Sequence, residues 1–289
     1  MNPWVMAARP ATLSAAIGPV LIGSASAWHD GVFAFVPFVV VLFCALAIQV
    51  GVNYANDLAD AQKGADTEDR IGPQRAVASG VISESSMRNG ILVAFGLAAL
   101  GGIYLIWYAG WPIFVIGLVS IIAALGYTNG PIPYGYYGLG EVFVFVFFGL
   151  VATVGTRYVF SASIPSAVWT GAVVMGLLAA AILEANNIRD IDTDRLAGKR
   201  TLAVVIGRQA SRRLFAATIW AAFLIVLFGS LVGWFPAMCL IAFAVAPLTI
   251  PLVKTVFEET SGPALIGVLK GTAQVQLFTG LLLALGIAF

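Results

Sequence analysis

Charged residues are scarce in this sequence of 289 residues: only 10% are Asp, Glu, Lys or Arg, whereas 60% are hydrophobic. A water-soluble domain has roughly 45–50% apolar and about 25% charged residues. The mean hydropathy of +0.97 points the same way. A formal net charge of +1 gives no support to a nucleic-acid partner. The composition therefore excludes a soluble globule and indicates an integral membrane protein.

Cysteine is also scarce, with two residues in the whole chain. Cys44 and Cys239 both lie inside apolar runs, and neither has the spacing of a metal ligand. A disulfide framework is therefore excluded, and both residues are interpreted as small core side chains.

Nine apolar runs are long enough to cross about 30 Å of hydrocarbon, which takes ~20 helical residues. Helices are expected because backbone groups in lipid must pair within their own segment. The sequence predicts an all-α polytopic membrane protein with nine transmembrane helices in a single domain, residues 1–289. The runs cover residues 11–28, 33–56, 89–108, 111–128, 138–160, 167–187, 213–233, 235–253 and 268–288.

The first run has an alternative interpretation as a cleavable signal peptide, with Arg9 before it and Ala25-Ser26-Ala27 near its end. A second apolar run follows after a few residues, and Arg9-Pro10 is typical of a helix start at a membrane interface. A retained helix is therefore favoured.

The basic residues indicate the orientation in the membrane. With nine spans, fourteen of the fifteen Lys and Arg residues fall on one side, and only Arg157 falls on the other. Cytoplasmic loops carry an excess of Lys and Arg. We therefore expect a protein of the cell membrane with a cytoplasmic N-terminus, cytoplasmic charged loops and an external C-terminus.

Two short windows, residues 53–80 and 186–201, hold eight of the fourteen acidic residues. Both begin at the predicted cytoplasmic end of a helix. Residues three or four apart share a helix face, so Asn56 lies with Asp60 and Asp190 with Asp194. If the two halves of the chain pack around a common centre, the two acidic clusters face each other.

The windows combine residue types suited to a metal and an anion. Carboxylate and amide oxygens bind Mg²⁺, usually together with substrate phosphates. The interleaved bases suit the remaining phosphate oxygens; they are Lys63, Arg70, Arg75, Lys199 and Arg200. Ordinary solvated loops would explain the bases but not the acids, because Asp and Glu contribute little to orientation. The windows predict a Mg²⁺–diphosphate clamp for a lipid diphosphate whose tail lies between the helices.

At these windows the sequence resembles the UbiA superfamily of intramembrane prenyltransferases. The pattern of that family is N-D-x2-D with a further Asp, followed by D-x3-D after the sixth helix. The matching stretches here are Asn56-Asp57-x2-Asp60 and Asp190-x3-Asp194. One departure is that Gly64 stands where many members have the further Asp, and Asp66 follows two positions later.

The resemblance implies roles for particular residues. Mg²⁺ would be held by Asn56, Asp60, Asp190 and Asp194, with Asp57, Asp66 and Asn187 as further ligand candidates. The substrates would be bound by Asn53, Lys63, Arg70, Arg75, Tyr127, Thr128 and Arg200. The catalytic set would be Asp60, Asp190, Asp194 and Lys199. Glu141 would either anchor the fifth span or face the site.

Two further stretches narrow the resemblance. R-x-G-P-x-R-A-V-A-S-G at residues 70–80 and G-K-R-T-L-A at residues 198–203 resemble the subgroup that prenylates 1,4-dihydroxy-2-naphthoate. That subgroup transfers a polyprenyl group from polyprenyl diphosphate to this aromatic acid, with loss of CO₂ and diphosphate, to give demethylmenaquinol. The implied partners are these two substrates and the lipid bilayer, with no protein partner required.

Three alternatives stay open. The same fold serves other acceptors: 4-hydroxybenzoate, homogentisate, haem B or a chlorophyll precursor. A secondary transporter would hold its ions near the bilayer midplane on broken helices, whereas these acids cluster at one face. A CDP-alcohol phosphotransferase would need a Gly directly after D-x2-D, and Ala61 follows Asp60.

Overall fold

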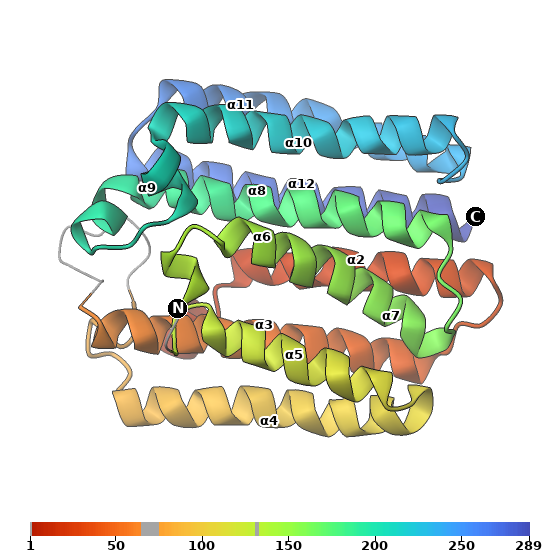
Figure 1. The fold of residues 1–289 in the computed structure, drawn as a ribbon, viewed down its shortest axis with the longest axis horizontal. Helices are drawn as coiled ribbons and strands as arrows, with labels where there is room; N and C mark the ends of the chain where they lie inside the picture. Colours follow the sequence, from red (N-terminus) through yellow and green to blue (C-terminus); the bar gives the residue numbers. More distant parts are fainter. Residues whose placement is uncertain (1, 65–74, 131–132) are drawn as a thin grey trace.

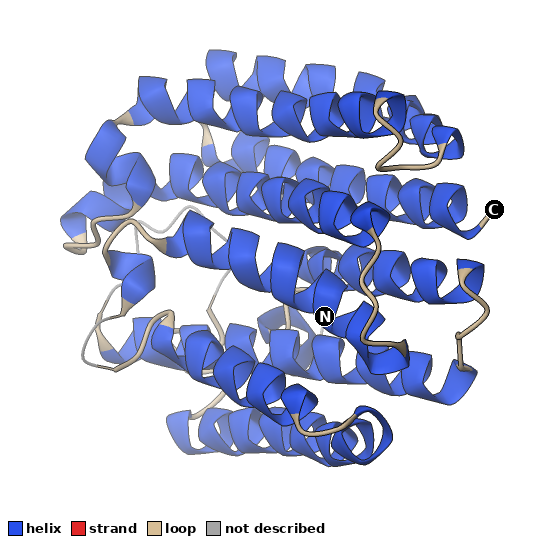
Figure 2. Ribbon diagram, turned by 45° about the vertical axis from the view of Figure 1, so that its right-hand side comes forward, coloured by secondary structure: helices blue, strands red, loops and turns tan. Residues whose placement is uncertain are grey.

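The structure is a computed structural model that describes residues 2–64, 75–130 and 133–289. The described residues form helices and loops, without a strand (Figure 2). The long helices run side by side, with the short helix α9 at the left-hand end of the bundle and the C-terminus at the right-hand end (Figure 1).

The helices follow one another along the chain in this order. The short helix α1 (Pro3–Ala7) precedes α2 (Pro10–His29), α3 (Phe35–Gln62), α4 (Glu84–Ala109) and α5 (Pro112–Gly126). A composite helix follows after the turn η1 (Tyr134–Tyr136), made of α6 (Gly140–Val144), the π-helical η2 (Phe145–Val151) and α7 (Ala152–Phe160). The remaining elements are α8 (Ser166–Leu196), α9 (Leu202–Ile206), α10 (Arg208–Leu231), the 3₁₀-helical η3 (Ala237–Leu248), α11 (Thr249–Glu258) and α12 (Gly262–Ala288).

The predicted all-α membrane architecture is confirmed. Within the described chain, eight helical stretches are long and apolar enough to cross a membrane. The remaining predicted span is the fourth in the chain, residues 111–128. It corresponds to α5, which has 15 residues. At 1.5 Å per residue α5 covers only about 22 Å, so it is shorter than the hydrocarbon layer. The protein is thus an integral multi-pass membrane protein.

Helices α3 and α8 continue well beyond the apolar runs that predict them. Those runs end at residues 56 and 187, whereas the helices end at Gln62 and Leu196. Hydropathy falls where the lipid ends, but the backbone hydrogen bonds of a helix do not depend on lipid. Both acidic windows are therefore carried in part by the ends of rigid helices, which position side chains better than loops do.

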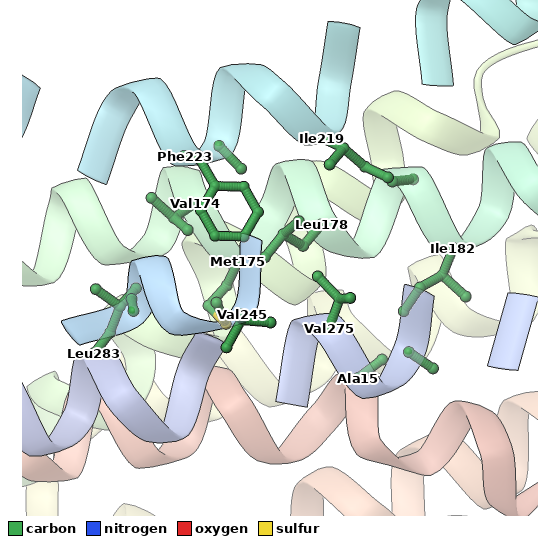
Figure 3. Packing of buried hydrophobic residues seen from close by; sticks show 14 of the residues in the cluster. Ala15, Val174, Met175, Leu178, Ile182, Ile219, Phe223, Val245, Val275 and Leu283 are labelled. Atoms are coloured by element: carbon green, nitrogen blue, oxygen red, sulfur yellow. The ribbon is translucent and has the colours of Figure 1, made fainter. Parts of the chain in front are cut away.

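The hydrophobic core surrounds α8. Met175 and Leu178 of α8 pack with Phe223 of α10, Val275 of α12 and Val245 of η3 (Figure 3). Helix α2 also lies inside the bundle, in contact with α12, α7 and α3. The first apolar run is therefore an integral part of the packing.

Small residues allow α2 and α12 to approach closely. A Cβ atom at Gly280 of α12 would lie 2.8 Å from the Cα atom of Gly18 in α2. In lipid, helices associate through such close packing, because lipid tails are as apolar as the side chains. Glycine at residue 280 therefore sets the distance between these two central helices.

Enlarging this residue is expected to destabilise the bundle. Gly280→Val would force two backbones apart, and overpacking typically costs about 1–3 kcal/mol. Gly96→Val in α4 is a matched control, because a Cβ atom there meets nothing within 4 Å. Thermal unfolding in detergent should show a lower Tm for Gly280→Val than for the control. Equal Tm values would contradict the packing of α2 on α12.

Candidate active site

A cavity of about 610 Å³ lies inside the bundle and is polar at one end. Its polar lining comes from both acidic windows and includes Asn56, Asp60, Asp190, Asp194 and Lys199. The rest of the lining is mostly apolar and comes from α3, α4, α5, η2 and α7; it includes Ile48, Ile106, Ile121, Phe147 and Val151. Such a cavity fits a molecule with a charged head and a long apolar tail.

Asp60 is the centre of the polar end. It is only 3% exposed. Its Oδ2 atom accepts a 2.6 Å hydrogen bond from Arg75 Nη2. Its Oδ1 atom accepts from Lys199 Nζ at 3.0 Å and from Tyr136 Oη at 2.9 Å. Buried charge requires such pairing, because an unpaired carboxylate would be too costly to desolvate.

Lys199 connects the two acidic windows. Besides its contact with Asp60, its Nζ atom lies 3.9 Å from Asp194 Oδ1. Lys199 follows α8, whereas Asp60 lies near the end of α3. The structure therefore brings the two windows together, as expected if the two halves of the chain pack around a common centre.

Asp190 has a cation of its own. Arg189 Nε donates to Asp190 Oδ1 at 2.7 Å, and Arg189 Nη2 donates to Asp190 Oδ2 at 2.5 Å. The same Nη2 atom donates to Asn186 Oδ1 at 2.8 Å. Arg189 itself is buried. Each of these two cavity-lining carboxylates, Asp60 and Asp190, is thus matched by positive charge.

Thr128 links α3 to the segment that follows α5. Its Oγ1 atom donates a 2.8 Å hydrogen bond to Asn56 Oδ1, and its carbonyl oxygen accepts from Lys63 Nζ at 2.5 Å. Thr128 and its neighbour Tyr127 both line the cavity, as their predicted site role requires. Partial burial lowers the pKa of Lys63; Asp60 opposes this shift and Lys199 adds to it.

Asp57 and Asn53 hold backbone in place. The two carboxylate oxygens of Asp57 accept hydrogen bonds from the backbone N–H groups of Ala76 and Val77, at 3.1 and 3.0 Å. Asn53 lines the cavity, but its amide donates to the carbonyl of Ala8 at 2.8 Å. These contacts favour an anchoring role for Asp57 over the predicted metal-ligand role.

Two predicted substrate-binding residues lie outside the cavity wall. The side chains of Lys63 and Arg200 are exposed, and neither residue is among those that line the cavity. The predictions for Asp66 and Arg70 lie outside the described residues.

Asn187 is held from behind by a buried carboxyl. It lines the cavity, and its Nδ2 atom donates to Glu141 Oε1 at 2.8 Å. Glu141 is buried at the start of α6. Of the two roles expected for Glu141, the structure shows an anchor, which ties α6 to α8.

Sequence reasoning missed Tyr136 and Arg189. In the sequence, Arg189 is one of the basic residues that indicate the membrane orientation, but Asn186 lies three residues earlier on the same helix face, where such residues meet. Tyr136 lies in the turn η1, within a stretch of sequence rich in Gly and Pro that carries no charged residue, so no motif marks it as a site residue.

The donor set at the polar end suits Mg²⁺. Hard oxygen ligands line this end of the cavity from two helices, α3 and α8. They belong to Asn56, Asp60, Asp190 and Asp194. Among the described residues, no three His, Cys, Asp or Glu side chains come close enough to hold a metal by themselves. Mg²⁺ is commonly bound by one or two carboxylates completed by substrate phosphates. These residues therefore fit a metal that arrives with a diphosphate.

Comparison with known proteins gives close relatives of nearly the same length. The chain is 37% identical to the 1,4-dihydroxy-2-naphthoate octaprenyltransferase of Escherichia coli (strain K12), over 98% of this chain and 94% of that protein. It is 38% identical to the Mycobacterium tuberculosis protein of the same name, over 99% of this chain and 97% of that protein.

The fold also matches solved structures. A UbiA homologue from Aeropyrum pernix K1 superposes with a TM-score of 0.71 at 15% identity, covering 95% of this chain and 96% of that one. A UbiA homologue from Archaeoglobus fulgidus, solved with DMAPP and Mg²⁺, has a TM-score of 0.66 at 13% identity, covering 98% and 99%. The UbiA prenyltransferase family matches residues 16–264. The chain therefore belongs to the UbiA prenyltransferase family.

Proposed function

We propose that this protein transfers a polyprenyl group from polyprenyl diphosphate to 1,4-dihydroxy-2-naphthoate, with loss of CO₂ and diphosphate, to give demethylmenaquinol. The observation that carries the proposal is the cavity, which is charged at one end and apolar over the rest of its length. The names of the relatives, at 37% and 38% identity over nearly the full chain, support this choice of acceptor.

The polar end binds the diphosphate. Lys199 and Arg75 lie within hydrogen-bond distance of Asp60, so they are already gathered where phosphate oxygens need cations. Asn56, Asp60, Asp190 and Asp194 would hold Mg²⁺. When bound, Mg²⁺ neutralises charge that develops on the departing diphosphate. The apolar lining receives the prenyl tail.

The chemistry is electrophilic alkylation of an aromatic ring. The allylic C–O bond breaks, and its electron pair leaves with the diphosphate. The ring carbon that carries the carboxylate attacks the allylic carbon. The bond to the carboxylate then breaks, CO₂ leaves, and its electron pair restores the aromatic ring. No oxidant is needed, and the electrons balance.

The protein contributes to this reaction by stabilising charge and by excluding water. Cations fixed at the polar end stabilise the leaving group without reorganising during the step. Apolar walls from α3, α5 and α7 keep water from the allylic carbon, which would otherwise capture it. The side chain of Asn187 is held by Glu141 at the cavity wall, where its oxygen can accept a hydrogen bond from an acceptor hydroxyl.

The position of the charged groups disfavours a transporter. Ion sites of secondary transporters lie near the bilayer midplane on discontinuous helices. Here the acidic windows lie at the ends of α3 and α8, which are continuous helices.

We further propose that the active-site end faces the cytoplasm of the cell and that the C-terminus lies outside. The uneven distribution of Lys and Arg supports this orientation, and the C-terminus lies at the opposite end of the bundle from α9 (Figure 1). Reporter fusions after Lys63 and after Phe289 are expected to report opposite sides. Reporters on the same side would contradict the orientation.

An assay with purified protein tests the function directly. Protein in detergent is mixed with Mg²⁺, one prenyl diphosphate and either 1,4-dihydroxy-2-naphthoate or 4-hydroxybenzoate. Mass spectrometry should find the prenylated product only with the first acceptor. Product from 4-hydroxybenzoate alone would keep the prenyltransferase activity and overturn the acceptor.

A further inference from the structure

The ring of Tyr136 is contacted by two lysine ammonium groups. Lys63 Nζ lies 4.3 Å from the ring centroid, and Lys199 Nζ lies 4.9 Å from it. The hydroxyl of Tyr136 donates to Asp60 Oδ1, the atom that also accepts from Lys199. Two cations and one carboxylate therefore meet at a single aromatic side chain.

The backbone holds Tyr136 in this place independently of the lysines. Its turn, η1, is tied to the end of α5, because Gly135 N donates to Tyr127 O at 3.0 Å. Its carbonyl oxygen accepts from Arg200 N at 3.0 Å, which joins the turn to the segment between α8 and α9. The ring thus has a fixed position at the meeting point of three chain segments, and Tyr136 lines the cavity.

Two ammonium groups close together repel each other, and the ring reduces this cost. Desolvation is the main cause that lowers the pKa of Lys63; the charge of Asp60 opposes this shift, and the charge of Lys199 adds to it. The negative face of an aromatic ring attracts cations within about 6 Å of its centroid. A lysine also has a flexible stem with a compact charge, so it can leave the ring for a phosphate oxygen without moving the backbone.

We propose that Tyr136 is a positioning residue that keeps Lys199, in the wall of the cavity, and Lys63, exposed just outside it, together as a pair of diphosphate-binding cations. Tyr136 takes no part in bond breaking. Its ring gathers the two charges before the substrate arrives, and its hydroxyl holds Asp60. The inference rests on the proposed function, because it concerns the diphosphate of the prenyl donor.

Substitutions at residue 136 separate the ring from the hydroxyl. Calorimetry with inorganic pyrophosphate and Mg²⁺ measures binding, and kinetics measure KM for each substrate. Tyr136→Leu is expected to weaken pyrophosphate binding and to raise KM for the prenyl diphosphate by roughly fivefold to thirtyfold. KM for the aromatic acceptor should not change. Tyr136→Phe keeps the ring and should stay closer to the wild type.

Tyr137→Leu is the matched control, because the neighbouring tyrosine is exposed and should bind pyrophosphate as the wild type does. A series of Tyr136→Phe variants with increasingly fluorinated rings tests the same contact at nearly constant shape, even if Tyr136→Leu does not fold. Fluorine weakens the negative ring face, so affinity should fall with each added fluorine. Constant affinity across this series would overturn the proposal.

The outcomes also distinguish this inference from the proposed function. Normal prenyl transfer by the wild type with unchanged pyrophosphate binding in Tyr136→Leu would overturn the inference alone. Loss in Tyr136→Phe as large as in Tyr136→Leu would assign the effect to the hydroxyl and overturn the role of the ring. A wild type that neither binds pyrophosphate nor turns over prenyl diphosphate would overturn both.

Discussion

Asp60→Asn should reduce kcat/KM for prenyl transfer by at least about 100-fold, the scale of loss when one preorganised charge-stabilising group is removed. The substitution nearly preserves shape but removes the charge at the centre of the polar end. That carboxylate is a proposed ligand of Mg²⁺, and it accepts hydrogen bonds from Arg75, Lys199 and Tyr136. Asp190→Asn should cause a similar loss, because Asp190 supplies the corresponding carboxylate from the other window.

The same substitution will also lower stability, and the two effects must be separated. Removing one partner of a buried ion pair costs about 3–5 kcal/mol, and Asp60 and Arg75 are both buried. Activity is therefore compared well below the Tm of each variant. Asp192→Asn is the matched control, because Asp192 lies in the same window as Asp190 but has a 72% exposed side chain paired to Arg208. If Asp60→Asn or Asp190→Asn is as active as this control, the proposed clamp is wrong.

Carboxyl-labelled 1,4-dihydroxy-2-naphthoate should lose its label completely as product forms. Substitution at the carboxylated carbon can restore the aromatic ring only if the carboxylate departs. Each molecule of prenylated product should therefore be matched by one molecule of labelled CO₂. The label in the trapped gas is measured and compared with the amount of product from the same reaction.

Two controls make this result specific. Without prenyl diphosphate, no label should be released, since the ring carbon is then not attacked. Asp60→Asn should slow label release and product formation by the same factor. Label retained in a prenylated product would contradict substitution at the carboxylated carbon, while membership of the UbiA prenyltransferase family would stand on its own evidence.

Hydropathy was sufficient to locate the helices, because the lipid imposes one simple requirement on every span. The predicted run at residues 138–160 matches α6 to α7, and the run at residues 11–28 matches α2. It did not show that α5 is short, because the predicted run of residues 111–128 also includes Trp111, Tyr127 and Thr128, which flank the 15-residue helix. Nor could it show how far α3 and α8 extend, since hydropathy reports the solvent rather than the backbone.

Motif spacing identified much of the polar end of the cavity. Asn56 and Asp60 share a face of α3, so their alignment follows from the helical repeat alone. The same repeat turns Asp57 about 100° away from Asn56, but its target could not be inferred. That target is the backbone of Ala76 and Val77, and a local motif contains no information about a loop that returns to it.

Only the tertiary structure decided which charges are paired. Lys199 meets Asp60 from 139 positions away, and Tyr136 meets it from 76 positions away. Composition established that the few charges of this chain must be concentrated at functional or interfacial positions, because lipid does not tolerate them elsewhere. Their partners depend on how α3, α8 and the turn η1 pack together. The bundle around these elements is held by close contacts such as that of Gly18 in α2 with Gly280 in α12, which no one-dimensional pattern specifies.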